Sequence, residues 1–386
     1  MNVKQPQSRY LSTRQRTVDI CSPLELEDYV PQPVVFVSPP KWHLGHTTWF
    51  FETFILTQFV SDYQLFHPDY GFVFNSYYNT VGERVVRENR GNLSRPVLSE
   101  VMAYRAHVDE HLSKLLSTNN EPQILSLLEI GLNHEEQHQE LLITDLKYIL
   151  GSNPLLPIYK AGHNLSADQN KSDESIAIDS GMYEIGHTED SFCFDNELSP
   201  HQVYVDSFEI QNRLVTNSEF LEFIQDDGYK RHELWLDEGW AWVNQNNINS
   251  PLYWHKIDGQ WHRFTLAGLV ALEPNNILAH VSHYEAAAFA EWKSARLPTE
   301  FEWEIASDKI DWGTRWEHTG SAYLAYPGFK KPKGAVGEYN GKFMMNQMVL
   351  RGASVATPPG HSRKTYRNFF HPNLQWQFSG IRLINT

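Results

Sequence analysis

The first 150 residues place apolar side chains at the spacing of amphipathic helices. The predicted helices cover residues near 10–30, 41–63, 98–117 and 122–150. The last of them, PQILSLLEIGLNHEEQHQELLITDLKYIL, is followed by stop signals at Gly151 and Pro154. Four helices joined by connections of varied length predict a helical bundle, and the core of a bundle is a common place for metal ligands.

The pattern changes after a polar stretch near 163–176 that is rich in Ser, Asp, Asn and Lys. From about 177, short apolar runs typical of strands alternate with loops dense in Trp, Gly, Pro and Asn. The predicted strands lie in HQVYVDSFEI, QWHRFTLAGL and QMVLRGAS, and a short helix lies in SHYEAAAFAEWKSA. This part of the chain therefore indicates a loop-rich α+β domain.

Length, charge and cysteine content narrow the function. A chain of 386 residues that is 41% hydrophobic is long enough for two cores. The net charge of −15 argues against nucleic acid or an anionic membrane as the main partner and favours a small polar molecule. No apolar run reaches membrane-spanning length and the N-terminal residues lack the apolar core of a signal peptide, so we expect a cytoplasmic protein. With only 2 cysteines, any metal must be held by His and carboxylate side chains.

Residues 134–138 read His-Glu-Glu-Gln-His, which is the H-E-x-x-H signature of zinc peptidases. On a helix, His134 and His138 lie on one face and can point at a common ion. The metzincin extension is absent, because Leu141 and Thr144 stand where it needs Gly and His. No acidic helix follows to supply the glutamate of other zinc peptidases. The pair alone fits a metal half-site or a solvated helix face, and a third ligand would have to lie upstream.

The upstream segment SPPKWHLGHTTWFFE carries His43 and His46, three residues apart. At least one of them could meet His134 and His138 across the bundle. Three histidines without a cysteine would leave open positions on an octahedral Fe(II) ion. Taken singly, each histidine is more often a packed or surface residue than a ligand.

Six segments of the chain resemble the EgtB family of ergothioneine-biosynthetic sulfoxide synthases. They are WHLGHTTWFFE, FNSYYNTVGERVVR, NHEEQHQELL, RLPTEFEWE, GAVGEYNGKFMMNQMVLRG and YRNFFHPNLQWQFSGIRL, in the order of the family and over nearly the whole chain. The resemblance implies a DinB-like four-helix bundle over 1–160, followed over 177–386 by a C-type-lectin-like domain of the formylglycine-generating-enzyme type.

The same resemblance implies an iron-dependent reaction. A mononuclear Fe(II) would be held by His46, His134 and His138, whereas His43 does not match a ligand position. With O2 as co-substrate, such enzymes join the sulfur of cysteine or γ-glutamylcysteine to the imidazole C2 of hercynine and oxidise it to a sulfoxide. Because no methyltransferase domain is present, hercynine would come from a separate histidine methyltransferase, and a C–S lyase would act downstream.

Several further residues match the substrate site of the family. Tyr77 and Tyr78 resemble active-site tyrosines, whose phenol can donate a proton to reduced dioxygen and favour C–S bond formation over thiol dioxygenation. Arg84 and Arg87 follow, and the match suggests that the guanidinium group of Arg87 binds the carboxylate of the thiol substrate. Without the resemblance, the tyrosine pair would be interpreted as structural and both arginines as surface residues.

The resemblance also assigns residues to hercynine. Gln137 would contact it, and Asn368, Phe369 and Phe370 would help to form a box in which aromatic rings attract the quaternary ammonium group. Members that use γ-glutamylcysteine carry an acidic residue where Phe370 stands, which favours free cysteine here. Glu135, without the context of a zinc peptidase, is interpreted as a residue of the helix surface or a support for a metal ligand.

Other functions stay open at this point. On the same fold, the enzyme could make selenoneine from hercynine and a selenosugar, or bond sulfur to a different carbon of histidine as in ovothiol synthesis. From other classes, the chain could be a zinc hydrolase that uses Glu135, or a binding module without a metal. Formylglycine-generating activity is disfavoured, because Cys193 has no cysteine partner in the C-terminal part.

Overall fold

The computed structural model describes residues 4–76, 78, 82–167, 174–331 and 340–385, which belong to two compact units. The first unit contains the chain up to Gly162 together with Ala356–His361, and the second contains most of the remaining residues. Among the described helices, none combines the length and the apolar character needed to cross a bilayer.

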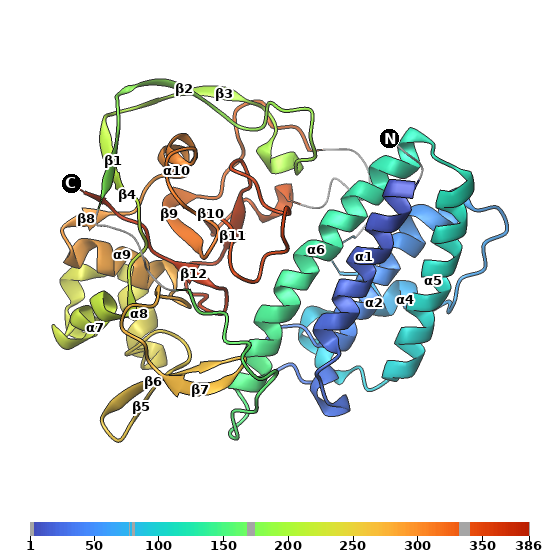
Figure 1. Ribbon diagram of the computed structural model, residues 1–386, viewed down its shortest axis with the longest axis horizontal. Helices are drawn as coiled ribbons and strands as arrows, with labels where there is room; N and C mark the ends of the chain where they lie inside the picture. Colours follow the sequence, from blue (N-terminus) through green and yellow to red (C-terminus); the bar gives the residue numbers. More distant parts are fainter. Residues whose placement is uncertain (1–3, 77, 79–81, 168–173, 332–339, 386) are drawn as a thin grey trace. The chain divides into compact units, whose positions relative to one another are not determined.

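Four long helices build the first unit (Figure 1). They are α1 (Lys4–Cys21), α2 (Pro40–Phe51), α5 (Leu98–Thr118) and α6 (Pro122–Gly151). Both α1 and α2 pack against α5 and α6, so the predicted bundle is confirmed. Shorter elements between the long helices are η1 (Leu26–Tyr29), α3 (Thr57–Phe59), α4 (Tyr70–Phe74) and η3 (Arg87–Asn92).

Two helix boundaries differ from the prediction. The first helix was expected near 10–30 but covers Lys4–Cys21, because Pro23 lacks an N–H and disfavours helical geometry in the residue before it. The second helix continues beyond Phe51 through a π-helical turn, Glu52–Leu56, and ends at Phe59 rather than near 63. Single π-helical turns are frequent near functional sites.

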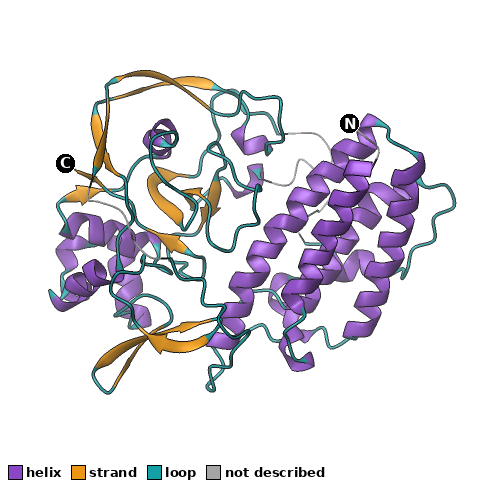
Figure 2. Ribbon diagram, in the orientation of Figure 1, coloured by secondary structure: helices purple, strands orange, loops and turns teal. Residues whose placement is uncertain are grey.

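In the part of the second unit that the structure describes, short strands are combined with four α-helices and several short 3-10 helices (Figure 2). The helices are α7 (Asn217–Gln225), α8 (Asp237–Asn246), α9 (His283–Trp292) and α10 (Glu300–Ala306). The strands are β1 (Ser175–Ile178), β2 (Gly181–Ile185), β3 (His201–Val205), β4 (Phe208–Gln211), β5 (Trp254–Ile257), β6 (Gln260–Thr265), β7 (Gly268–Ala271), β8 (Ala295–Arg296), β9 (Trp316–Ala322), β10 (Met348–Gly352), β11 (Asn368–Phe370), β12 (Ser379–Gly380) and β13 (Ile384–Asn385). This confirms the predicted α+β class.

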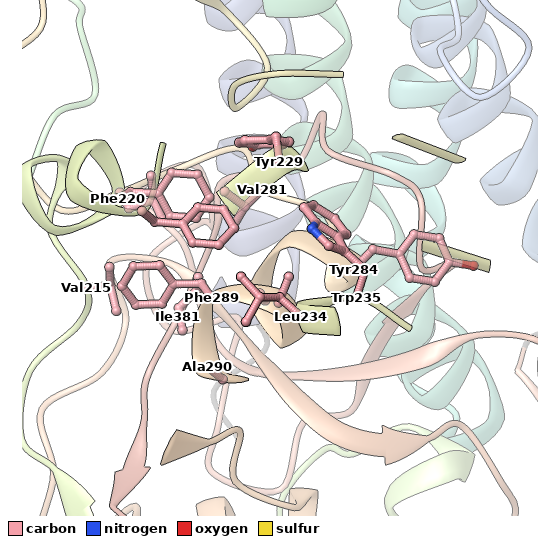
Figure 3. Packing of buried hydrophobic residues seen from close by; sticks show 14 of the residues in the cluster. Val215, Phe220, Tyr229, Leu234, Trp235, Val281, Tyr284, Phe289, Ala290 and Ile381 are labelled. Carbon is pink, nitrogen blue, oxygen red and sulfur yellow. The ribbon is translucent and has the colours of Figure 1, made fainter. Parts of the chain in front are cut away.

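Among the described residues, the strands form four small sheets, with orders β1-β4-β13-β8, β11-β10-β9-β12, β2-β3 and β5-β6-β7. In the second of these, β10 pairs antiparallel with both β9 and β11, and β12 joins β9 in parallel. Helix α9 begins with a capping box, in which Ser282 accepts from the backbone N–H of Glu285 and the Glu285 carboxylate accepts from that of Ser282. Figure 3 shows the aromatic core beside it, where Phe220 and Phe289 stack at 5.3 Å.

Candidate metal centre

Three histidines converge in the core of the bundle. His46 lies on α2, and His134 and His138 lie one turn apart on the facing side of α6. Their ligand atoms are all within 4.8 Å of one another, and the Nε2 atoms of His46 and His134 are 3.2 Å apart. No other group of three or more His, Cys, Asp or Glu side chains with such spacing occurs among the residues that the structure describes.

The orientation of His46 is set by the backbone of α4. Its Nδ1 lies 2.6 Å from the carbonyl oxygen of Phe74, which can only accept, so Nδ1 carries the proton and Nε2 keeps its lone pair. Gly45 allows this approach, because a Cβ atom there would lie 2.2 Å from the ring of Phe74. A glycine next to the ligand therefore lets a second element hold the imidazole.

Stacked aromatic rings cover His46. Trp42 stacks on its ring at 4.5 Å with 13° between the planes, and Trp49 stacks at 5.5 Å with 16°. Both indole N–H groups are buried and have no hydrogen-bond partner among the described residues. Two orphaned donors beside three imidazoles indicate a place where a ligand with acceptor atoms would satisfy buried polar groups.

A buried guanidinium group extends this stack. The Cζ atom of Arg90, in η3, lies 3.4 Å from the centre of the Trp42 ring. Its two terminal nitrogens donate to the hydroxyl groups of Ser38 and Ser76, each at 2.9 Å. The site therefore has a positive charge one ring away from His46.

The three imidazoles are held in their neutral form. Burial lowers the pKa of His134 to about 3 and lowers the pKa values of His46 and His138 well below the usual 6.5. The neighbouring imidazoles and Arg90 lower the pKa of His138 further. Neutral imidazole is the metal-binding form of histidine, so the burial that disfavours protons leaves three lone pairs for a cation.

Glu135 points into a different cluster, on the side of α6 that faces α1 and α5. Its carboxylate is fully buried and accepts from Arg14 and Arg105, both at 2.9 Å, and from Thr17 at 2.6 Å. Burial alone opposes its charge, but the two guanidinium groups outweigh this and lower its pKa to about 2. The interpretation of Glu135 as a helix-surface residue was therefore wrong. A carboxylate bound to two arginines is not positioned to act as the base of a zinc hydrolase.

The other predicted residues of the first unit lie around the loop after α4. Tyr78 is fully buried and its ring packs against Trp49 at 5.5 Å, whereas Tyr77 lies outside the described residues. Arg84 is half-buried, and its Nη1 has no hydrogen-bond partner among the described residues. Arg87 is exposed and donates to the carbonyl oxygen of Phe36 at 2.6 Å.

Gln137 is half-buried on α6, in the turn between the two histidines. Asn368, Phe369 and Phe370 form β11 in the second unit. There, Phe369 stacks on Tyr323 at 4.0 Å, and Phe370 meets Trp376 edge-on at 4.9 Å. Each of the two phenylalanine rings therefore lies against another aromatic ring of the second unit.

Sequence reasoning missed the residues that surround the triad. His43, considered as an alternative ligand, instead has its Nδ1 atom 2.8 Å from Nδ1 of His138. Trp42, Trp49 and Arg90 were not singled out. A signal existed for Arg90, which lies three residues after Arg87 and so one turn along any helical segment.

Comparison with known proteins gives the same division of the chain. Residues 9–142 match the DinB superfamily, and residues 161–323 match the sulfatase-modifying factor enzyme 1-like domain. The chain is 30% identical over 301 residues to the hercynine oxygenase of Mycobacterium tuberculosis, which covers 65% of this chain and 69% of that protein. It is 28% identical over 350 residues to the hercynine oxygenase of Mycolicibacterium smegmatis, covering 77% and 80%.

A more distant relative matches only part of the chain. The formylglycine-generating enzyme of Bos taurus is 26% identical over 166 residues, which is 38% of this chain and 44% of that enzyme. Together, the two family models confirm the expected fold, a DinB-like helical domain followed by a lectin-like domain of the formylglycine-generating-enzyme type.

Proposed function

The chain belongs to the hercynine oxygenase (EgtB) family of oxidoreductases, sulfoxide synthases of ergothioneine biosynthesis, and we propose that it uses Fe(II) and O2 to join a thiol to hercynine. The thiol is cysteine or γ-glutamylcysteine, its sulfur bonds to C2 of the hercynine imidazole, and the product is the sulfoxide. The observation that carries the proposal is the convergence of three buried, neutral imidazoles within 4.8 Å.

The donor set fits iron(II). Three neutral nitrogen ligands on two helices leave coordination positions open and leave the charge of a divalent ion uncompensated. Iron in this position would supply the activation of O2 and bind the substrate sulfur as a thiolate. His46, His134 and His138 are the proposed ligands.

The protein side chains would bind and orient the organic substrates. Arg87 and Arg84 are proposed for the carboxylate of the thiol substrate, and the buried Arg90 offers a third guanidinium group close to the triad. The phenols of Tyr77 and Tyr78 are proposed as proton donors. For Tyr78, the support is its contact with Trp49, which itself stacks on His46.

Gln137 is proposed as a contact of hercynine. Asn368, Phe369 and Phe370 are proposed, from the resemblance to the family, as part of an aromatic box for a trimethylammonium group. A quaternary ammonium group donates no hydrogen bonds, so aromatic faces are a suitable environment for it. Phe370 also leaves the site without an acidic partner for the extra amino group of γ-glutamylcysteine at this position, which favours cysteine. A separate histidine methyltransferase would supply hercynine and a C–S lyase would consume the product, and the cytoplasmic location stays a prediction.

The test is mass spectrometry of the products after anaerobic loading with Fe(II) and exposure to O2. Hercynine is supplied with cysteine in one reaction and with γ-glutamylcysteine in another. We expect a hercynylcysteine sulfoxide in the cysteine reaction, none with His134→Ala, and an unchanged yield with His111→Ala on α5. A loaded enzyme that gives no product with either thiol would contradict the proposal, and a selenosugar or plain histidine would then be the substrates to test.

A further inference from the structure

A chain of three buried polar groups leads away from the triad. Nδ1 of His43 lies 2.8 Å from Nδ1 of His138, and Nε2 of His43 lies 3.0 Å from Oδ2 of Asp145. The same carboxylate oxygen accepts from the backbone N–H of Ser38 at 2.8 Å. His43 is 1% exposed and Asp145 is 2% exposed, so water does not compete for these contacts.

Only one arrangement of the protons on His138 and His43 allows His138 to bind a metal. If the metal takes the lone pair of Nε2, the proton of the neutral imidazole is on Nδ1, and Nδ1 must donate. Nδ1 of His43 is then the acceptor. The proton of His43 is consequently on Nε2, where it is donated to the carboxylate of Asp145.

The opposite arrangement is penalised twice. If Nδ1 of His43 were the donor, His138 would carry its proton on Nε2 and would have no lone pair for the metal. Nε2 of neutral His43 would then turn a lone pair toward the carboxylate of Asp145, so that two acceptors would face each other in a buried place. The carboxylate therefore selects the arrangement that metal binding requires.

We propose that His43 and Asp145 are positioning residues, which together hold His138 in the tautomer and orientation that present Nε2 to the metal. This inference rests on the proposed metal centre and adds residues that bind neither metal nor substrate. Hydrogen-bond partners of ligating histidines typically contribute about 10- to 100-fold to metal affinity.

The decisive experiment replaces His43 in two ways and measures Co(II) affinity by visible absorption in the otherwise intact protein. In His43→Asn, the amide oxygen lies near the place of Nδ1 and can still accept from His138, although the side chain is smaller. In His43→Phe, a ring of similar shape remains but no acceptor faces His138. If His43 only fills space, the His43→Phe variant should keep the higher Co(II) affinity. If His43 accepts a hydrogen bond from His138, the His43→Asn variant should keep the higher Co(II) affinity.

We expect Co(II) affinity to fall about 10- to 100-fold in His43→Phe and by less than about threefold in His43→Asn. Asp145→Asn, which retains an acceptor oxygen but removes the charge, should give an intermediate loss. The matched pair His111→Asn and His111→Phe on α5 should leave the affinity unchanged, and circular dichroism should show that each variant is folded.

A second readout does not depend on affinity. Nitrogen-15 spectra of histidine-labelled, Zn(II)-loaded protein should show His43 protonated on Nε2 in the wild type. Equal affinities for the two His43 variants, or a weaker affinity for Asn than for Phe, would overturn the inference. If the wild-type protein binds no Co(II), or if His134→Ala binds it equally well, the metal centre itself is wrong, so the two failures are distinguishable.

Discussion

Two buried polar clusters lie on different faces of the same turn of α6. Burying polar side chains costs free energy, and the two clusters reduce this cost in different ways. The arginine cluster places the Glu135 carboxylate between the guanidinium groups of Arg14 and Arg105, so opposite charges compensate each other inside the protein. The imidazole cluster, made of His46, His134 and His138, instead avoids charge, because burial lowers the pKa of each ring.

The difference shows which cluster is built for a ligand. Both carboxylate oxygens of Glu135 accept from donors within the protein, so this network needs no ligand to satisfy it. The imidazole cluster brings lone pairs together, and two orphaned indole N–H groups lie beside it. Two neighbouring residues of one sequence motif thus have different roles. His134 belongs to the proposed metal centre, and Glu135 belongs to a structural network of ion pairs.

The largest expected effect is the loss of the metal. Replacing His134 by alanine should abolish stoichiometric Fe(II) binding under anaerobic conditions, because two imidazoles on separate helices cannot hold the ion alone. Iron content and circular dichroism should show a folded protein without metal. Full iron occupancy in this variant would remove His134 from the ligand set.

A substitution in the arginine cluster should lower the free energy of unfolding and leave metal binding unchanged. Glu135→Gln removes the charge that Arg14 and Arg105 share, although Arg14 keeps its ion pair with Asp109 at 2.7 Å. Breaking a buried ion pair typically costs about 3–5 kcal/mol. Urea denaturation at neutral pH should show this loss, while the fraction of protein that binds iron stays the same. The half-buried Glu136, which pairs with His361 at 3.0 Å, provides the control Glu136→Gln with a smaller loss. A catalytic base at Glu135 would give the reverse result, normal stability without activity.

A substitution of Tyr78 tests whether this residue takes part in the proposed reaction or only packs beside the imidazole cluster. Tyr78→Phe keeps the ring that packs against Trp49 and removes only the hydroxyl group. If the phenol donates a proton, sulfoxide formation should slow by about 100-fold and the share of simple thiol oxidation should rise, with unchanged metal affinity. An unchanged rate and product ratio would assign the residue to packing alone.

The smallest expected effect is on the pH dependence of the free energy of unfolding, to which the two clusters contribute in different pH ranges. In the unfolded chain a histidine takes up a proton near 6.5, whereas folded His134 does so only near 3, so its stabilising contribution is complete above 6.5 and is lost as the pH falls toward 3. Each such imidazole can add a slope of about 1.4 kcal/mol per pH unit to the free energy of unfolding of the metal-free protein. The stabilising contribution of Glu135 is complete above about 4.5 and is lost as the pH falls toward 2, so this carboxylate adds a pH dependence only below about 4.5.

Thermal unfolding between pH 5 and 6.5 tests this contribution. Between pH 5 and 6.5, Glu135 stays ionised in both states and adds no slope to the free energy of unfolding. Buried histidines of the second unit, His283 and His318, also add to this slope, so the contribution of His134 is measured as a difference between variant and wild type. His134→Gln should have a shallower slope than the wild-type protein. Equal slopes for the two proteins would mean that His134 is not held neutral in the fold.

Much of the fold was predictable because its signals are local. Apolar spacing indicates α5 and α6 to within a residue or two, and S-x-x-E at Ser282 marks the beginning of α9. The end of α1 was misjudged, since its apolar positions continue past the proline that stops it. Resemblance to a family supplied His46 as the third histidine, which spacing alone could not separate from His43.

The surroundings of the triad could not be predicted, because they come from distant parts of the chain. Asp145 reaches His43 across 102 residues of sequence, and Arg14 reaches Glu135 across 121. A single sequence does not show which of its polar residues will be buried together. Glu135 therefore looked like a surface residue on a helix rich in Glu and Gln.

The sequence by itself determined that His134 and His138 share one helix face, that cysteine ligands are excluded from any cluster, and that a helical part precedes a strand-rich part. Each follows from residue spacing or composition. Only the tertiary structure decided that His46 faces the pair, that His43 turns to His138 and Asp145, and that all three imidazoles are neutral. The physical reason is that contacts between helices and the loss of water around a side chain depend on packing, which the order of residues does not display.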